Sequence, residues 1–122
     1  MAKKILVVDD DTTVGECLKA MLEEAGFEVL LAASGREGIK KAEAAQPDLV
    51  ITDYLMDDIS GGAMAKYLSD HKQTATIPLI FITTLFNHNE AEFTKNRLGP
   101  YEFLPKPIER EQLLTLVNKV LG

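Results

Sequence analysis

The sequence predicts an α/β fold in which a parallel β-sheet is covered by helices on both faces. Five short apolar runs, each about four to six residues long, alternate with longer segments in which apolar residues recur at helical spacing. Such continuous apolar runs are typical of strands buried on both faces of a parallel sheet. Because crossovers between parallel strands are right-handed, the alternation predicts a doubly wound (βα)5 architecture.

The first strand is expected at about residues 4–8, and the helix that follows it near 13–25. Apolar residues recur in that helix at every third or fourth position. Thr13, with Glu16 three residues later, forms a capping-box pattern, and Gly26 is placed to end the helix.

The middle of the chain predicts two further strands and two helices. A strand over 27–32 leads to a short, alanine-rich helix over about 35–45, which ends before a proline. The third strand, 48–53, is followed by a loop over 54–60 and by a helix that starts near Gly61.

The last part of the chain completes the alternation. The fourth strand is expected at 79–83, directly after a proline, and residues 87–98 predict a weakly patterned fourth helix. The fifth strand is expected at 101–105 and the final helix at about 109–121. We expect the flavodoxin-like strand order 2-1-3-4-5, whose switch point lies between the first and third strands.

Composition bounds the class of protein. A chain of 122 residues has the size of one domain, so a single domain over residues 1–122 is expected. The formal net charge of −6 and the lack of a basic stripe argue against direct binding to nucleic acid or to an anionic membrane. No apolar stretch approaches the roughly 18 residues of a membrane span, and no signal peptide is recognisable.

The single cysteine, Cys17, is predicted to be a small buried residue of the first helix. A free thiol in a chain that cannot form an internal disulfide fits a reducing compartment. A cytoplasmic location without membrane insertion is therefore expected.

Polar residues stand at the ends of four predicted strands. They are Asp9, Asp10 and Asp11, then Asp53, Thr83 and Lys106. Ligands of open parallel sheets bind in the crevice at the carboxyl ends of the strands, so these residues are expected to form one site. Clustered aspartates repel phosphate unless a cation intervenes, and carboxylates are hard oxygen ligands that suit Mg²⁺. A site of this kind that handles phosphate therefore requires a metal.

The residue types suit phosphoryl transfer. Asp53, at the end of the central strand, could act as a nucleophile toward phosphorus and form an acyl phosphate. Mg²⁺ and the ammonium of Lys106 would clamp the charge of the transferred group, and Thr83 could donate a hydrogen bond to it. Asp11, by contrast, is interpreted as a residue at a helix N-terminus, where an acid favours the helix dipole.

In this order and at these intervals, the segments resemble the receiver domain of two-component response regulators, the chemotaxis-regulator type of module. The resemblance covers essentially the whole chain. The segments that carry it are Val7–Asp11, Leu49–Met56, Gly61, Ile80–Thr83 and Gly99–Pro107.

The resemblance implies that Asp53 accepts phosphate from a phosphohistidine on a sensor histidine kinase or a phosphotransfer protein. The Mg²⁺ ligands that it implies are Asp9, Asp10, Asp53 and the backbone carbonyl of Leu55, with Asp9 acting mainly through water. Such a module is a signalling switch and not an enzyme, since it catalyses only its own phosphorylation and dephosphorylation.

The resemblance also implies how the switch works. Thr83 and Lys106 would grip the phosphoryl group, and Phe103 would be the aromatic side chain that moves inward as the threonine is drawn to the phosphate. The Lys106–Pro107 peptide bond is expected to be cis. An unidentified downstream protein would bind the face formed by the fourth helix, the fifth strand and the last helix.

Three positions depart from the family pattern. Asp57 stands where a proline commonly follows the methionine, Ser60 where an aspartate often precedes the glycine, and Thr84 where a smaller residue is common. A further carboxylate beside the site could slow phosphate entry or alter metal affinity. Asp57 and Thr84 keep open the alternative of a pseudo-receiver, which binds partners without being phosphorylated.

A second alternative belongs to a different class. Residues 9–13 fit the D-x-D-x-T motif of haloacid-dehalogenase-type phosphatases, in which Asp9 would be the nucleophile and Asp11 the general acid. That family places a metal-binding acidic motif after its lysine, whereas Asp53 precedes Lys106 here. The phosphoacceptor interpretation is therefore favoured.

Overall fold

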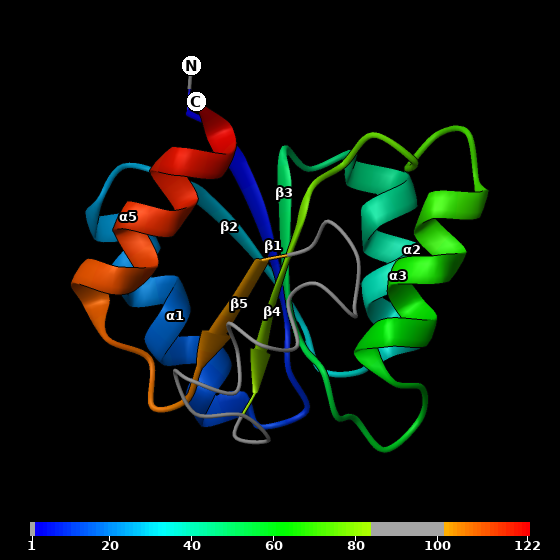
Figure 1. Cartoon of the computed structure of the whole chain (residues 1–122), viewed down its shortest axis with the longest axis horizontal. Coiled ribbons are helices and arrows are strands. Elements are labelled where there is room, and N and C mark those ends of the chain that lie inside the picture. The colour runs from blue at the N-terminus through cyan, green and yellow to red at the C-terminus, as the bar shows by residue number, and fades with distance from the viewer. Residues whose placement is uncertain (1, 84–101) are drawn as a thin grey trace.

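The computed structural model describes residues 2–83 and 102–122, which form a parallel five-stranded sheet between two layers of helices (Figure 1). The strands are β1 Lys4–Val8, β2 Glu28–Ala32, β3 Leu49–Asp53, β4 Leu79–Thr83 and β5 Glu102–Pro105. The described helices are α1 Thr12–Glu24, α2 Gly35–Ala45, α3 Gly61–Asp70 and α5 Arg110–Leu121. The helix predicted over 87–98 and the departure at Thr84 lie outside the described residues.

The strand order is β2-β1-β3-β4-β5, and every neighbouring pair is parallel. This confirms the doubly wound, flavodoxin-like α/β architecture. Helices α1 and α5 cover one face of the sheet, and α2 and α3 cover the other (Figure 1). The order of the strands changes direction between β1 and β3, where a crevice opens at their carboxyl ends.

Each face of the sheet has its own apolar core, because side chains alternate between faces along every strand. On the α1/α5 face, Ile5 and Val7 of β1 pack with Leu18 and Leu113. On the opposite face, Leu6 and Val8 of β1 pack with residues of α2 and α3, among which Met64 of α3 is fully buried. All of β1 after Lys4, and all of β3 and β4, are buried, as the continuous apolar runs predicted.

The start of α1 differs from the prediction. The N-cap is Asp11, whose side chain accepts hydrogen bonds from the backbone N–H groups of Thr13 and Val14, so the proposed capping box of Thr13 with Glu16 is wrong. Asp11 is the better cap because its carboxylate reaches both donors from the extended residue before the helix. The interpretation of Asp11 as a helix N-terminal residue is confirmed.

The predicted burial of Cys17 is also wrong, since its side chain is exposed. The buried stripe of α1 consists of Gly15, Leu18 and Leu22. Cys17 is rotated away from that stripe by one position and lines a groove that α1 shares with Lys106. The exposed position does not alter the core.

The first strand and the last helix place the described ends of the chain at the amino ends of the strands (Figure 1). Strand β1 starts there, and α5 runs back antiparallel to the sheet and finishes beside it. None of the helices within residues 2–83 and 102–122 combines the length and the apolar character of a membrane span.

Candidate functional site

Three carboxylates meet at the carboxyl edge of the sheet. Asp9 directly follows β1 and Asp53 is the last residue of β3, and these strands are neighbours in the sheet. Asp9, Asp10 and Asp53 each offer a carboxylate oxygen, and these oxygens all lie within 4.8 Å of one another. Asp9 and Asp53 are buried, whereas Asp10 is exposed and open to water. The acidic cluster expected from the sequence is therefore present.

Lys106 extends into this cluster from the end of β5. Its Nζ lies 2.9 Å from Oδ2 of Asp9 and 3.2 Å from Oδ2 of Asp53, and its side chain is only 14% exposed. The other oxygen of Asp9 accepts the backbone N–H of Asp11 at 2.8 Å. Both oxygens of the buried Asp9 are thus satisfied, which fixes its orientation. The Lys106–Pro107 bond is cis, as expected.

Thr83 ends β4, the strand next to β3, and is buried. Its carbonyl accepts the backbone N–H of Lys106 at 2.9 Å, so the threonine and the lysine are joined through the main chain. The structure therefore places Thr83 at the same edge of the sheet as the acidic cluster.

Leu55 follows Asp53 by two residues, and its backbone N–H donates to Oδ1 of Asp53 at 3.3 Å. The residue as a whole is 52% exposed. The main chain of Leu55, and not its side chain, is the part in contact with the site. The expected role of the Leu55 carbonyl as a Mg²⁺ ligand stays a prediction.

A row of aromatic rings runs from the acidic edge across the sheet to β5. The ring of Tyr54, the residue after Asp53, lies edge-on to that of Phe81, with centroids 5.3 Å apart. The ring of Phe81 lies 5.3 Å from that of Phe103, its partner in the β4–β5 register. Phe103 is half-buried. Phe103, the residue predicted to be the aromatic switch, is therefore linked through the ring of Phe81 to Tyr54.

The charges of the cluster are not balanced. Burial raises the pKa of Asp53 above 3.8 and the charge of Asp9 raises it further, while Lys106 lowers it by a smaller amount. Burial tends to lower the pKa of Lys106, but the two carboxylates outweigh it and the pKa ends above 10.5. The ammonium is attracted by both carboxylates, whereas Asp53 is also repelled by Asp9. Among the residues that the structure describes, the cluster sets three carboxylates against one ammonium, which leaves negative charge to be compensated.

The chemistry of these donors fits a divalent cation. All three cluster residues present carboxylate oxygens, which are the ligands that Mg²⁺ prefers, and the exposed Asp10 leaves room for the waters that Mg²⁺ retains. The uncompensated negative charge favours a cation at the same place.

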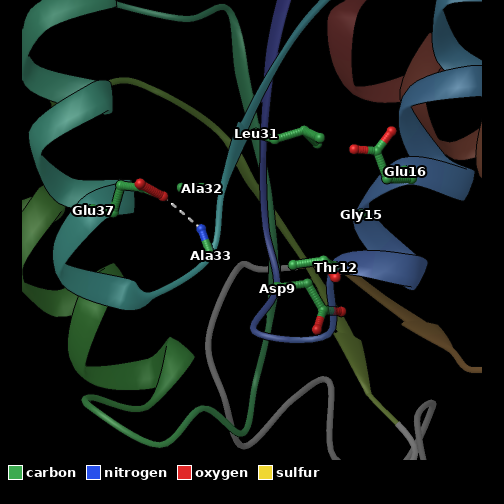
Figure 2. A pocket seen from close by; sticks show the side chains of 8 residues that line it. All are labelled: Asp9, Thr12, Gly15, Glu16, Leu31, Ala32, Ala33 and Glu37. Atoms are coloured by element: carbon green, nitrogen blue, oxygen red, sulfur yellow. Dashed lines mark hydrogen bonds between the residues drawn. The ribbon is translucent and has the colours of Figure 1, made fainter.

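A small pocket adjoins Asp9 between the N-terminal ends of α1 and α2 (Figure 2). Its lining residues are Asp9, Thr12, Gly15, Glu16, Leu31, Ala32, Ala33 and Glu37. The carboxylate of Glu37 accepts the backbone N–H of Ala33 at 2.7 Å. Because none of the eight lining residues is cationic, the acidic character of this edge extends as far as α2.

Two contacts of the β3–α3 loop were not predicted from the sequence. The backbone N–H of Asp57 donates to Oδ2 of Asp10 at 3.3 Å. The carboxylate of Asp58 accepts from the N–H groups of Gly35 and Arg36 at the start of α2. The only signal for the first contact is that position 57 is not proline, since proline has no N–H to donate.

The fold and the site together define a CheY-like α/β domain with an acidic pocket at its switch point. Residues 5–118 match the family described as response regulator receiver domain, and the chain belongs to that family. It is similar to Protein PilH of Pseudomonas aeruginosa, with 36% identity over 119 residues that cover 98% of each chain. It is also 27% identical to the polar-differentiation response regulator DivK of Brucella ovis, over 100% of this chain and 98% of that protein.

Other curated relatives are longer than this chain. The transcriptional regulatory protein PhoP of Bacillus subtilis is 32% identical over 124 residues, which cover 99% of this chain and 49% of that protein. The chain therefore spans about half the length of that relative.

Solved structures agree with the family assignment. A putative response regulator from Chloroflexus aurantiacus superposes with a TM-score of 0.88 at 34% identity, covering 99% of this chain and 98% of that one. The chemotaxis protein CheY4 of Vibrio cholerae superposes with a TM-score of 0.86 at 30% identity, covering 98% and 99%. Membership of this family makes the chain a two-component signalling module and not an enzyme, and the phosphatase alternative is set aside.

Proposed function

We propose that the chain accepts a phosphoryl group on Asp53 in a Mg²⁺-dependent reaction and thereby changes its affinity for a downstream protein. The observation that carries this proposal is the meeting of Asp53 with Asp9, Asp10 and Lys106 at the switch point of the sheet. Receiver domains are typically phosphorylated by histidine kinases, so the donor is a phosphohistidine of a sensor kinase or of a phosphotransfer protein.

Asp53 is the nucleophile in this proposal. One of its carboxylate oxygens forms a bond to phosphorus while the bond from phosphorus to the histidine nitrogen breaks, and that nitrogen keeps the electron pair. The product is an acyl phosphate, and the negative charge that the phosphoryl group adds to the cluster is met by the ammonium of Lys106, which lies 3.2 Å from Asp53.

Lys106 and Thr83 act on the phosphoryl oxygens. The ammonium already lies 3.2 Å from Asp53, so it can follow a phosphoryl group attached there and neutralise charge on its oxygens. The hydroxyl of Thr83, at the end of the adjacent strand, would donate a hydrogen bond to another oxygen.

Asp9, Asp10 and Asp53, with the carbonyl of Leu55, would hold Mg²⁺. When bound, the ion neutralises negative charge and orients the phosphoryl oxygens for in-line transfer. The buried carboxylate of Asp9 is already held in place by the amide of Asp11 and the ammonium of Lys106. It would therefore present its negative charge to the ion without having to reorient. Asp10, exposed and held by the loop amide of Asp57, provides the accessible ligand.

The output in this proposal is a repacking of Phe103. As Thr83 moves toward the phosphate, space beside β4 opens for the ring of Phe103, which already lies against Phe81. The population then shifts between two packings of the surface that includes β5 and α5. The downstream protein would recognise one of them.

Incubation with Mg²⁺ and acetyl phosphate tests the proposal by mass spectrometry of the intact protein. The expected result is one added phosphoryl group on the wild-type protein and none on Asp53→Asn. A chain that gains no mass with acetyl phosphate, phosphoramidate or a phosphorylated kinase is a pseudo-receiver, and the proposal is then wrong.

A further inference from the structure

The loop between β3 and α3, residues 54–60, is closed at its base by a tight backbone contact. The N–H of Gly61 donates to the carbonyl of Tyr54 at 2.7 Å. A Cβ on Gly61 would lie 2.4 Å from the carbonyl oxygen of Asp53, so only glycine permits this approach. The two ends of the loop are therefore fixed to each other and to Asp53.

The outer part of the loop is held by α2 through Asp58. Its Oδ1 accepts from the N–H of Gly35 at 3.0 Å and its Oδ2 from the N–H of Arg36 at 2.9 Å. The next amide of α2, that of Glu37, is capped by Ser34. Amides in the first turn of a helix lack intrahelical partners, and the helix dipole favours a negative charge there. Asp58 thus supplies the hydrogen-bond acceptors for two N–H groups that have no acceptor within α2.

Packing beside Asp58 depends on the same contact. The side chain of Ile59 lies where a Cβ of Gly35 would be, with Cγ1 at 2.3 Å from that position. Loop and helix therefore fit closely only because residue 35 is glycine. A hydrogen-bonded pair of amides and an apolar contact together fix the loop on α2.

Between these two anchors the loop contacts the acidic cluster. The N–H of Asp57 donates to Oδ2 of Asp10, and the N–H of Leu55 donates to Oδ1 of Asp53. Both contacts are to carboxylates that the proposed function assigns to Mg²⁺. The position of the loop therefore determines how Asp10 and the main chain of Leu55 are presented to the ion.

We propose that Asp58 is a positioning residue of the metal site, which acts by fixing the β3–α3 loop on the first turn of α2. This inference rests on the proposed function, because it concerns Mg²⁺ binding at the same cluster. Asp58 does not touch the ion in this account. It holds Asp57 against Asp10, as groups behind the direct ligands orient them in other metal sites.

The test compares Asp58→Ala with Asp57→Ala by calorimetric titration of the whole chain with Mg²⁺. Both variants remove one carboxylate from the same loop, but only Asp58→Ala removes the contact with α2. We expect Mg²⁺ affinity to fall about tenfold in Asp58→Ala, as is usual for loss of a group that orients ligands, and much less in Asp57→Ala. Asp58→Asn keeps one acceptor oxygen and should recover part of the affinity.

A second measurement does not depend on the metal. The amide proton shifts of Gly35 and Arg36 in NMR spectra report the two hydrogen bonds directly. They should move upfield in metal-free Asp58→Ala and stay in place in Asp57→Ala. Gly35→Ala, which displaces Ile59, should weaken Mg²⁺ binding in the same direction. If Asp58→Ala fails to fold, Asp58→Asn against Asp57→Asn gives the comparison with a smaller expected difference, because asparagine keeps one of the two acceptor oxygens.

The outcomes separate the two proposals. Equal Mg²⁺ affinities of Asp58→Ala and Asp57→Ala overturn the role of Asp58, while phosphorylation of Asp53 in the wild-type protein leaves the proposed function standing. A wild-type chain that binds no Mg²⁺ and accepts no phosphate overturns both.

Discussion

The ammonium of Lys106 lies 2.9 Å from a carboxylate oxygen of Asp9, across 97 positions of sequence. The same ammonium reaches Asp53 at 3.2 Å, so one cation bridges the ends of two adjacent strands. Burial limits the access of water to these groups, and their mutual interactions are correspondingly stronger than at the surface. The stability of the domain and the geometry of the acidic cluster therefore depend on the same three side chains.

Lys106→Met should lower the free energy of unfolding by roughly 2 kcal/mol in metal-free buffer, because it leaves two buried carboxylates without their shared cation. Urea titration in the presence of a chelator measures this loss. Saturating Mg²⁺ should restore part of it, and metal binding itself should persist. Phosphorylation of this variant should no longer alter the surface around β5. A variant as stable as the wild type would show that the bridge does not contribute.

Asp53→Asn should stabilise the metal-free domain at neutral pH and raise its melting temperature by a few degrees. The pKa of Asp53 is raised above 3.8 in the folded protein by burial and by Asp9, so the native state binds a proton more tightly than the unfolded chain. Ionisation therefore disfavours folding above that pKa, and asparagine resembles the protonated form. The gain should shrink as pH falls through the raised pKa of Asp53 and should be absent below about 3.8, where the carboxyl is protonated in both states. A lower melting temperature at pH 7 would contradict this reasoning.

The pH dependence of Asp58 has the opposite sign. Hydrogen bonds from the amides of Arg36 and, less strongly, Gly35 lower the pKa of Asp58 below 3.8. Its contribution to stability is therefore present above that value and is lost as pH falls through the lowered pKa. At pH 7 we expect the free energy of unfolding of the wild type to exceed that of Asp58→Asn by less than about 1 kcal/mol, since the carboxylate is exposed. The difference should vanish near pH 2, as measured by urea unfolding at each pH.

Gly61→Ala should destabilise the domain by about 1–3 kcal/mol, the usual cost of inserting a methyl group into filled space. The new Cβ would meet the main chain of Asp53 and Tyr54, which cannot move aside without displacing the carboxylate of Asp53. Slower phosphorylation by acetyl phosphate should accompany the lower melting temperature.

Gly62→Ala is the matched control. A Cβ at position 62 meets only the ring of Tyr54 at ordinary contact distances, beginning at 3.5 Å. Because alanine is favoured over glycine within a helix by about 1 kcal/mol, this variant should be as stable as the wild type or more so. Similar losses in both variants would show that crowding against Asp53 is not the cause.

The sequence was sufficient to predict the sheet and the acidic cluster, for a clear physical reason. Buried parallel strands are continuous apolar runs, and residues that end such strands meet at one edge whatever their separation in sequence. The proximity of Asp9, Asp53 and Lys106 could therefore be predicted from the sequence alone. The roles assigned to them, and to Leu55, Thr83 and Phe103, remain predictions.

Contacts between a loop and the end of a distant helix could not be predicted in this way. Asp58 lies in the β3–α3 loop and Gly35 begins α2, and no periodic pattern relates a loop residue to the first turn of a helix elsewhere in the chain. The N-cap of α1 was assigned to Thr13 because several adjacent residues there suit capping, and only the backbone conformation distinguishes them. The exposure of Cys17 depends on a rotation of about 100° between successive helical residues, which a burial argument based on residue type ignores.

Because β1 begins and α5 finishes at the pole of the molecule remote from the aspartates, attachments at either end project away from them. Fluorophores, affinity tags or fused reporter proteins can be joined there at a distance from the acidic cluster. Placing a donor dye at one end and an acceptor on the partner would thus follow complex formation in real time.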